Sequence, residues 1–398
     1  MTEPLEGRPL SIALFSDSAL PIRNGVSVSI DALVGHLREQ GHNVHLFAPR
    51  YPGFVDEDPN VHRLRSLMTP FAGGTPFAWP LFTGARRFKR EQFDVVHVHT
   101  PWITGMLGVR WARNAGIPVV ATYHTQYVRY IHYVHFGPDW LKKAVTVRHI
   151  CRVLNSCSRV IVPSAPGRRW LRRMGVHRPT SVIPTGVPKP RRFAQFSERG
   201  RLGARPGQTI VLTCSRLAPE KNFDLLISAF SRAVKLDPSL VLWIVGDGPD
   251  REQITELIRL HGIGNNVRLF GSVERSEVDH FYAAADLFVF TSVTETQGLV
   301  VLEAMSYGLP VVVCRGGGAS TPIVDGVNGL KVRTDPVQIS DAILRVAHDE
   351  WLAAKLCDGA KQSARRATVD VMARDTVKVY REALGDSSRK VLPVESAK

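Results

Sequence analysis

Two glutamates separated by seven residues stand in the segment 291–313, TSVTETQGLVVLEAMSYGLPVVV. The pattern predicts a strand, a tight turn at Gly298 and a helix from about Leu299, with Glu295 before the helix and Glu303 within it. Since a helix rises about 1.5 Å per residue, the two carboxylates would lie roughly 12 Å apart. That span fits a sugar, a diphosphate and a ribose in a row, with the helix N-terminal amides facing the diphosphate. Spacing alone leaves an equally good alternative, in which one glutamate is a charge at the helix N-terminus and the other is a solvated helix residue.

Two cations flank a proline-containing turn in the segment 214–230, CSRLAPEKNFDLLISAF. Arg216 and Lys221 directly follow an apolar run that reads as a strand. Two fixed cations at the carboxyl end of a strand could clamp a diphosphate and stabilise it as a leaving group. Surface salt bridges to Glu220 and Asp224 are the alternative.

The first half of the chain offers two further candidates. In the segment 16–37 a strand leads through a turn with Gly25 into a helix that we expect Ser27 to open, and Gly25 would let a phosphate approach the backbone amides. In VVATYHTQY, His124 follows a strand at the edge favoured for catalytic groups in open sheets. A common turn glycine and a hydrogen-bonded scaffold histidine are the alternatives.

Short runs rich in Val and Ile alternate with longer amphipathic stretches, which is typical of parallel strands covered by helices. The runs of the first half are 11–16, 43–48, 95–100, 118–123, 159–164 and 181–185. Those of the second half are 209–215, 240–246, 266–271, 287–292 and 310–314. Each set predicts one doubly wound parallel sheet, and two such α/β domains facing each other would place their strand carboxyl ends on a shared central cleft.

The predicted organisation follows from these runs. We expect an N-terminal doubly wound domain over 1–190, a charged, proline-containing linker over 191–208, and a C-terminal doubly wound domain over 209–368. A helix over 369–386 would pack back on the first domain, before a polar tail over 387–398.

Composition narrows the class of protein. The 398 residues are 44% apolar and 22% charged, as in globular proteins, and no apolar run approaches the roughly 18 residues of a membrane span. The first ten residues are acidic where a signal peptide is basic. Five cysteines form no Cys-x-x-Cys pair, which favours buried thiols in a reducing compartment. We therefore expect a cytoplasmic protein.

The positive charge is concentrated in the first half. Residues 1–190 hold 24 Lys and Arg against 11 Asp and Glu, and the remainder holds 27 against 25. Such asymmetry favours a polyanionic partner, either anionic lipid or nucleic acid. Two basic amphipathic stretches, 139–155 and 168–178, are typical of helices in a membrane interface, although each could equally cover a sheet with its apolar side. Among their basic residues, the six that we expect at the membrane are Lys142, Lys143, Arg168, Arg169, Arg172 and Arg173.

Together the segments resemble the retaining glycosyltransferases of family 4, which have a GT-B fold of two Rossmann-like domains. The resemblance rests on FSDSALPIRNGVSVSI, DVVHVHTPW, YHTQYVRYIHY, VIPTGV, SRLAPEKN, VGDGP, the paired glutamates and DGVNGL. The segments ETQGLVVLEAM and YHTQYVRYIHY are similar to those of the subgroup that glycosylates diacylglycerol and related membrane lipids.

The resemblance implies roles for the donor side. Arg216 and Lys221 would hold the donor diphosphate, and Glu303 would bond the ribose hydroxyls. Glu295 would bond sugar hydroxyls beside the backbone of Gln297, Gly298 and Leu299.

The resemblance also implies roles for the first domain. His124 would lie beside the transferred sugar, and Gly25 would contact the phosphate. Asp17, Tyr127 and Tyr130 would lie on the acceptor side.

Two features concern the chemistry. Family members of this type retain anomeric configuration without an obvious carboxylate nucleophile. The run Asp56-Glu57-Asp58 lies in a polar stretch between predicted strands and is interpreted as solvated charge, not as an Asp-x-Asp metal site, so we expect no metal and no cofactor beyond the donor. The acidic residue that usually follows the glycine pair after the strand 310–314 is missing, because the run continues from Arg315 through three glycines to Thr321. This departure leaves the sugar open.

The sequence thus predicts a hexosyltransferase peripheral on the cytoplasmic face of a membrane. UDP-glucose or UDP-galactose as donor and a lipid hydroxyl such as that of diacylglycerol as acceptor are favoured. GDP-mannose with phosphatidylinositol or a glycolipid is the alternative. Two remoter alternatives are a nucleotide-sugar epimerase, which shares the two-domain fold, and a nucleic-acid-binding protein, for which no RNP-like strand or helix-turn-helix signature is present.

Overall fold

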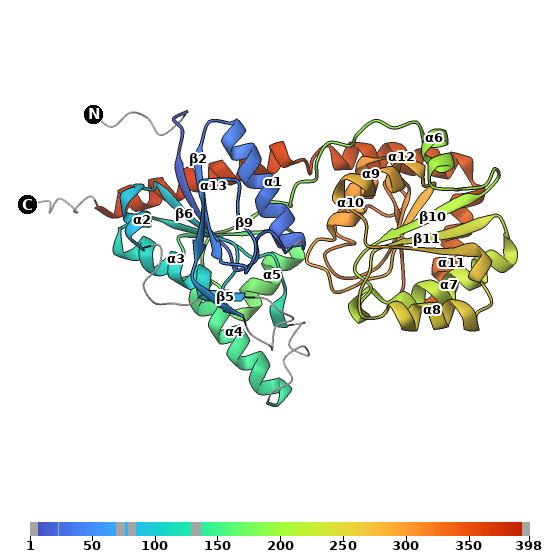
Figure 1. Cartoon of the computed structure of the whole chain (residues 1–398), viewed down its shortest axis with the longest axis horizontal. Helices are drawn as coiled ribbons and strands as arrows, with labels where there is room; N and C mark the ends of the chain where they lie inside the picture. Colours follow the sequence, from blue (N-terminus) through green and yellow to red (C-terminus); the bar gives the residue numbers. More distant parts are fainter. Residues whose placement is uncertain (1–6, 23, 69–75, 79–84, 129–136, 392–398) are drawn as a thin grey trace, which may run out of the picture. The chain divides into compact units, whose positions relative to one another are not determined.

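The computed structural model describes residues 7–22, 24–68, 76–78, 85–128 and 137–391 (Figure 1). The chain divides into two compact units. The first comprises Met1–Gly186 together with Val369–Lys398, and the second comprises Val187–Thr368.

The first unit is built on a seven-stranded parallel sheet of order β3-β2-β1-β6-β7-β8-β9. Its strands are β1 (Ser11–Phe15), β2 (Asn43–Pro49), β3 (Val61–Leu64), β6 (Val95–Val98), β7 (Val119–Thr122), β8 (Arg159–Val162) and β9 (Thr180–Val182). Its helices are α1 (Gly25–Glu39), α2 (Ala85–Arg90), α3 (Ile103–Asn114), α4 (Asp139–Asn155), α5 (Ala165–Met174) and α13 (Val369–Val391). A small antiparallel pair, β4 (Ser66–Met68) and β5 (Pro76–Ala78), lies outside this sheet.

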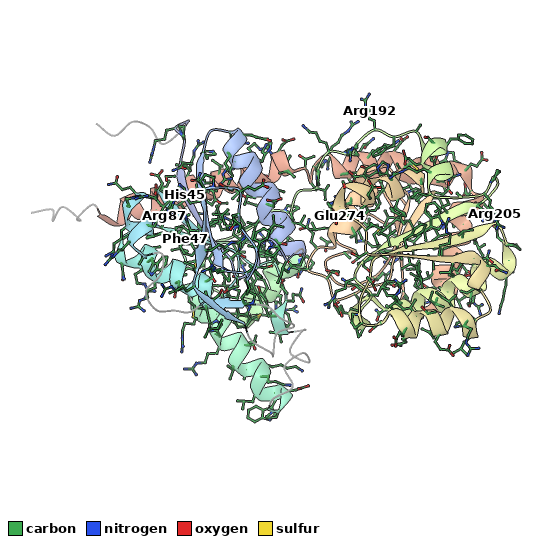
Figure 2. The ribbon with its side chains drawn as sticks, viewed as in Figure 1. His45, Phe47, Arg87, Arg192, Arg205 and Glu274 are labelled. Carbon is green, nitrogen blue, oxygen red and sulfur yellow. The ribbon has the colours of Figure 1, made fainter. Side chains whose placement is uncertain are left out.

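Helices cover both faces of this sheet, which is why its central strands β1, β6, β7 and β8 are largely apolar. On one face Phe15 stacks on Phe47 with ring centroids 4.6 Å apart, within a cluster that includes residues of α3, α4 and α5. The other face packs against α1 and α13. His45 and Phe47 both come from β2 and lie inside the unit (Figure 2).

The second unit has a six-stranded parallel sheet of order β12-β11-β10-β13-β14-β15. Its strands are β10 (Thr209–Cys214), β11 (Leu240–Val245), β12 (Val267–Gly271), β13 (Leu287–Phe290), β14 (Val311–Cys314) and β15 (Leu330–Val332). Its α-helices are α6 (Gln195–Arg201), α7 (Phe223–Leu236), α8 (Arg251–Leu260), α9 (Arg275–Ala284), α10 (Leu299–Ser306), α11 (Pro336–His348) and α12 (Glu350–Ala364), and its 3-10 turns are η2 (Pro219–Lys221) and η3 (Gly264–Asn266).

Each sheet contains one point at which the strand order reverses. In the first unit this point lies between β1 and β6, and in the second it lies between β10 and β13. The loops that leave the carboxyl ends of two such strands run in opposite directions and leave a crevice between them, where ligands bind in open α/β sheets.

The eleven predicted strands are all present, and the α/β class with two doubly wound parallel sheets is confirmed. The sequence prediction missed the short edge strands β3 and β15, and β4 and β5. It also misplaced the start of α1, because Asn24 is the N-cap and its side chain accepts from the amides of Val26 and Ser27.

The segment 191–208, expected to be a linker, contains α6 and belongs to the second unit. Arg199 in α6 donates to the backbone oxygen of Ala284 and forms an ion pair with Asp286, so charges that suggested a solvated connection instead attach the segment to the sheet. Arg192, by contrast, is exposed and projects outward (Figure 2).

The last helix, α13, completes the core of the first unit. Met372, Ala373, Val377 and Tyr380 are buried against the face of the sheet that α1 also covers. At its far end Arg159 of β8 pairs with Glu382 and Asp386, both at 2.8 Å.

The thiols are mostly enclosed. Cys157, Cys214 and Cys314 are buried, Cys151 and Cys357 are half-buried, and burial raises the pKa of the Cys157 thiol to about 12. No helix among the described residues is long and apolar enough to span a membrane.

We predict that Tyr380→Ala destabilises the first unit. Tyr380 is fully buried, and truncating a large aromatic side chain leaves a cavity, so the free energy of unfolding should fall by about 3 to 5 kcal/mol. Chemical denaturation measures this. The control is Phe196→Ala, since Phe196 is 89% exposed, and this change should cost at most about 0.5 kcal/mol. Equal effects would contradict the packing of α13.

Candidate active site

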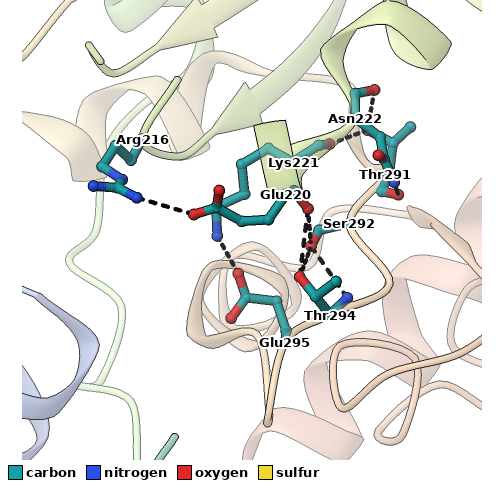
Figure 3. Close-up of polar contacts among 8 residues, drawn as sticks. All are labelled: Arg216, Glu220, Lys221, Asn222, Thr291, Ser292, Thr294 and Glu295. Carbon is teal, nitrogen blue, oxygen red and sulfur yellow. Dashed lines mark hydrogen bonds and ion pairs between the residues drawn. The ribbon is translucent and has the colours of Figure 1, made fainter. Parts of the chain in front are cut away.

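The loops after β10 and β13 are joined by hydrogen bonds from side chains to backbone. Thr291 donates through its hydroxyl to the carbonyl oxygen of Lys221 at 2.8 Å, and Ser292 donates in the same way to Glu220 at 2.7 Å. Asn222, which adopts a left-handed conformation with φ of 55°, donates to the carbonyl oxygen of Thr291 at 3.2 Å. The two loops therefore form one rigid surface (Figure 3).

Both predicted cations lie on this surface, each beside a carboxylate. Lys221 forms an ion pair with Glu295, and Arg216 pairs with Glu220 at 3.1 Å (Figure 3). Burial raises the pKa of Glu220, but hydrogen bonds from its own backbone amide and from Arg216 outweigh burial, so the net shift is downward. The structure thus brings Arg216, Lys221 and Glu295 together, 5 and 74 residues apart in sequence.

The turn before α10 depends on two glycines. Gly298 has φ of +74°, and a Cβ there would lie 2.7 Å from the Cβ of Ala319. A Cβ on Gly318 would lie 1.8 Å from the carbonyl oxygen of Thr296. The glycine run that follows β14 therefore packs directly against the backbone of this turn, which explains why it is free of side chains there.

The amide end of α10 lies next to this turn. The helix begins at Leu299, as the sequence predicted, and its N-cap Gly298 has no side chain that could cap the first amides. A helix N-terminus of this kind attracts an anion because its amide groups and its dipole act in the same direction. Gln297, also predicted to lie here, is buried.

Glu303 lies within α10 and has two protein partners. Arg275 and the hydroxyl of Tyr282 each donate to one of its carboxylate oxygens at 2.9 Å. Burial raises the pKa of Glu303, with Arg275 and Tyr282 acting in the opposite direction. The contact of Glu303 with ribose stays a prediction, and sequence reasoning missed Arg275 and Tyr282, which orient the carboxylate.

Gly25 is the first residue of α1 and follows the reversal point of the first sheet. The side-chain oxygen of Asn24 already accepts from the amides of Val26 and Ser27, both at 3.0 Å. A phosphate that binds the amides of Val26 and Ser27 would therefore have to compete with the Asn24 side chain. The phosphate contact stays a prediction.

His124 lies two residues beyond the end of β7, near the same edge of the first sheet. Its Nε2 lies 2.9 Å from Nδ1 of His99, which directly follows β6, and the two rings are stacked. Burial lowers the pKa of His124 to about 4, so the ring is neutral at physiological pH. The alternating histidines of VVHVHT were the only sequence signal for His99.

Asp17 is buried, and its carboxylate accepts hydrogen bonds from other residues of the first unit. Thr100 donates to it through its hydroxyl at 2.6 Å, and the amide of Thr104, in the first turn of α3, donates at 2.9 Å. Burial raises the pKa of Asp17, while the hydrogen bonds from Thr100 and Thr104 lower it. Asp17 thus caps α3, a structural role that the sequence did not indicate, and its acceptor contact stays a prediction.

Tyr127 belongs to an aromatic group at the same edge. Its ring packs edge-on against Trp102 at 5.1 Å, and Trp102 stacks on His149 at 5.3 Å. His149 is hydrogen-bonded to the carbonyl oxygen of Pro101 at 2.7 Å. Tyr130, also predicted on the acceptor side, lies outside the described residues.

The two basic helices differ in what they expose. In α5 the apolar Leu171 is buried and Trp170 packs against the core, so only its arginines face outward. In α4 the first half exposes apolar side chains, with Trp140 at 70%, Leu141 at 44% and Val145 at 59%. This part of α4 projects beyond the sheet of the first unit (Figure 1).

Within α4, Lys143 and Arg148 are exposed, and Lys142 pairs with Asp139 at 2.8 Å. The exposed arginines of α5 are Arg168, Arg169, Arg172 and Arg173. In the part of the chain that the structure describes, no three His, Cys, Asp or Glu side chains are grouped so that they could hold a metal ion.

Comparison with known proteins identifies the family. The model described as Glycosyltransferase Family 4 matches residues 23–190, and that described as Glycosyl transferases group 1 matches residues 195–366. The alpha-monoglucosyldiacylglycerol synthase of Streptococcus pneumoniae is 33% identical over 322 residues, which are 76% of this chain and 70% of the synthase. The chain belongs to glycosyltransferase family 4.

Two other similarities bear on this family 4 glycosyltransferase. The GDP-mannose-dependent alpha-mannosyltransferase of Mycobacterium tuberculosis is 31% identical over 361 residues, covering 85% of this chain and 88% of that enzyme. The structure of HepE from Anabaena in complex with UDP has a TM-score of 0.76 at 21% identity, and covers 94% of this chain and 100% of that chain. The predicted GT-B fold and the predicted hexosyltransferase class are confirmed.

We predict that Gly298→Ala destabilises the second unit more than Gly262→Ala does. Both glycines have a left-handed backbone, with φ of +74° and +68°, but only at Gly298 does a Cβ meet another atom. The free energy of unfolding should fall by about 2 to 3 kcal/mol at Gly298 and by about 1 kcal/mol at Gly262. Chemical denaturation followed by fluorescence tests this. Equal losses would show that the turn does not pack on Ala319.

Proposed function

We propose that this enzyme transfers a hexose from UDP-glucose or UDP-galactose to a hydroxyl of a membrane lipid such as diacylglycerol, with retention of anomeric configuration. The observation that carries the proposal is the grouping of Lys221, Arg216 and Glu295 beside the amide end of α10. The similarity to the Streptococcus pneumoniae enzyme named alpha-monoglucosyldiacylglycerol synthase supports the lipid acceptor.

In this proposal Lys221 and Arg216 neutralise the diphosphate as it leaves. Each now pairs with a carboxylate, so a diphosphate would replace Glu295 at Lys221 and Glu220 at Arg216. Once Lys221 pairs with the diphosphate, Glu295 would be available to accept hydrogen bonds from sugar hydroxyls. Binding of the diphosphate and recognition of the sugar would therefore be coupled. Cations fixed in advance stabilise developing negative charge without reorganisation during the reaction.

Glu303 and the backbone from Gln297 to Leu299 complete the donor site in this proposal. Arg275 and Tyr282 hold the Glu303 carboxylate in one orientation, in which its remaining lone pairs could accept from ribose hydroxyls. The amides at the start of α10 would face a phosphate oxygen.

The proposed chemistry is an exchange on one face of the sugar. The bond between the anomeric carbon and the phosphate oxygen breaks, and the acceptor oxygen bonds to the same carbon from the same side. The acceptor proton passes to a phosphate oxygen of the departing nucleoside diphosphate, so the protein itself mainly orients the reactants and balances charge. In this scheme His124 contacts the transferred sugar, Gly25 a phosphate, and Asp17, Tyr127 and Tyr130 lie toward the acceptor.

We also propose that the first unit binds the cytoplasmic face of an anionic membrane through α4 and α5. The exposed Trp140, Leu141 and Val145 would enter the interface, and the neighbouring lysines and arginines would contact lipid headgroups. This arrangement would hold the enzyme at the membrane surface, where a diacylglycerol acceptor lies.

Transfer from GDP-mannose to phosphatidylinositol or a glycolipid is the second candidate, favoured by the similarity to the mannosyltransferase of Mycobacterium tuberculosis. Incubating the enzyme with each nucleotide sugar and vesicles that contain diacylglycerol or phosphatidylinositol separates the two. Conversion of the donor without lipid would favour an epimerase. Salt-sensitive binding of an oligonucleotide at physiological ionic strength would favour a nucleic-acid-binding protein.

We predict that Lys221→Ala weakens donor diphosphate binding by about tenfold and lowers kcat by about a hundredfold, because it removes a cation from the leaving group. Calorimetry with UDP and transfer assays measure the two effects. The matched control is Lys235→Ala, which removes an exposed lysine of α7 and should change neither. Unchanged UDP affinity in the Lys221 variant would contradict the proposed site.

We predict that replacing Trp140, Leu141 and Val145 together by Ser lowers binding to phosphatidylglycerol vesicles by about tenfold or more, because less apolar surface can enter the bilayer. Flotation assays measure this. The control replaces Leu236, Leu260 and Trp351 by Ser, since they are 72%, 65% and 73% exposed in the second unit. Equal loss in both triple variants, or none in either, would refute the role of α4.

A further inference from the structure

Three histidines form a chain at the carboxyl edge of the first sheet. His97 on β6 is fully buried, and His99 just beyond it is 1% exposed. Their ring centroids lie 4.0 Å apart, and His99 in turn stacks on His124 at 5.2 Å. The chain therefore runs from the interior of the sheet toward the end of β7.

The inner histidine is fixed from two sides. The hydroxyl of Tyr380, from α13, lies 2.6 Å from Nδ1 of His97, and the hydroxyl of Thr122, from β7, lies 2.7 Å from its Nε2. Both hydroxyls can donate or accept. His97 thus fills its place without imposing a proton position on its neighbours, and its ring limits how the ring of His99 can turn.

The contact between His99 and His124 does require a choice. Nδ1 of His99 and Nε2 of His124 are 2.9 Å apart, and burial keeps the pKa of both rings below the physiological range. Two neutral rings share one hydrogen bond, so exactly one of these two nitrogens carries the proton. Either His99 donates to His124, or His124 donates to His99.

The other nitrogen of His99 decides between the two arrangements. Nε2 of His99 is buried and has no hydrogen-bond partner among the described residues. If His124 donated, this nitrogen would carry a buried N–H with no acceptor, and in folded proteins orphaned buried N–H groups are rarer than unsatisfied buried acceptors. If His99 donates, the same nitrogen carries only a lone pair.

We infer that His99 is a positioning residue, which donates through Nδ1 to Nε2 of His124 and so leaves the proton of His124 on Nδ1, as a hydrogen-bond donor to the substrate. Its relevance to transfer rests on the proposed function, in which His124 contacts the transferred sugar. The described residues supply no hydrogen bond to Nδ1 of His124, and its side chain is half-buried.

This tautomer assigns a defined task to His124. A neutral imidazole with Nδ1 protonated and Nε2 already accepting has no lone pair left for a substrate proton. His124 would therefore hydrogen-bond a sugar oxygen as a donor and would not act as the base. The proton of the acceptor hydroxyl must then pass to another group, which agrees with a phosphate oxygen of the leaving diphosphate as its recipient.

The experiment compares two substitutions at His99. The amide nitrogen of Asn can stand near the position of Nδ1, so His99→Asn keeps the donor, whereas His99→Leu removes it. We expect His99→Leu to lower kcat by about tenfold or more with an unchanged donor KM, and His99→Asn to recover kcat to within about threefold of the natural enzyme. His45→Leu is the matched control, since His45 is also buried and lies 2.7 Å from His62, and it should leave kcat unchanged.

A second measurement tests the inference without activity. In the natural protein labelled with 15N-histidine, NMR should show His124 protonated at Nδ1 and bare at Nε2. Protonation at Nε2 of His124 would overturn the inference, and so would equal kcat for the Asn and Leu variants in an enzyme whose transfer is lost in His124→Ala. If His124→Ala retained full transfer while NMR showed the expected tautomer, the role of His124 in the proposed function would fail. The assignment of His99 Nδ1 as the hydrogen-bond donor to His124 would stand.

Discussion

The reversal of strand order between β10 and β13 is the constraint on which the proposed donor site of this enzyme depends. Because the two strands are adjacent and parallel, the loops that follow them leave the same edge of the sheet, where Thr291 and Ser292 bind the loop that carries Lys221. The pairing of Lys221 with Glu295 follows from this contact. Cation, carboxylate and helix N-terminus are thus positioned by the sheet itself.

Much of this arrangement could be predicted from the sequence because it depends on local patterns. The eleven strands predicted from apolar runs are all present, and the turn predicted at Gly298 correctly located the start of α10 at Leu299. Arg216 and Lys221 were predicted together because they follow the same strand. Strands β3 and β15 were missed since, at three or four residues on a sheet edge, they carry too few apolar side chains to form a pattern.

Other parts could not be predicted because they depend on contacts between distant residues. Glu303 is oriented by Tyr282 and Arg275, and Asp17 caps α3 across more than eighty residues. The position of His99 against His124 arises from the pairing of β6 with β7, which the sequence predicted only as two strands. The helix α6 lies in a segment whose composition predicted a linker. Its Arg199 donates to the backbone oxygen of Ala284 and its Arg201 pairs with Glu277, contacts that the composition could not indicate.

The place of α13 in the first unit has a consequence for how the protein is made. Its residues Met372 to Ala383 cover one face of a sheet whose strands were all translated before the second unit began. On the ribosome, the nascent first unit must therefore wait with the part of that face beside α1 uncovered while some 180 further residues, 187–368, are synthesised. Chaperones that bind exposed apolar surface would meet this face during biosynthesis, and a chain truncated before Val369 would keep it exposed permanently.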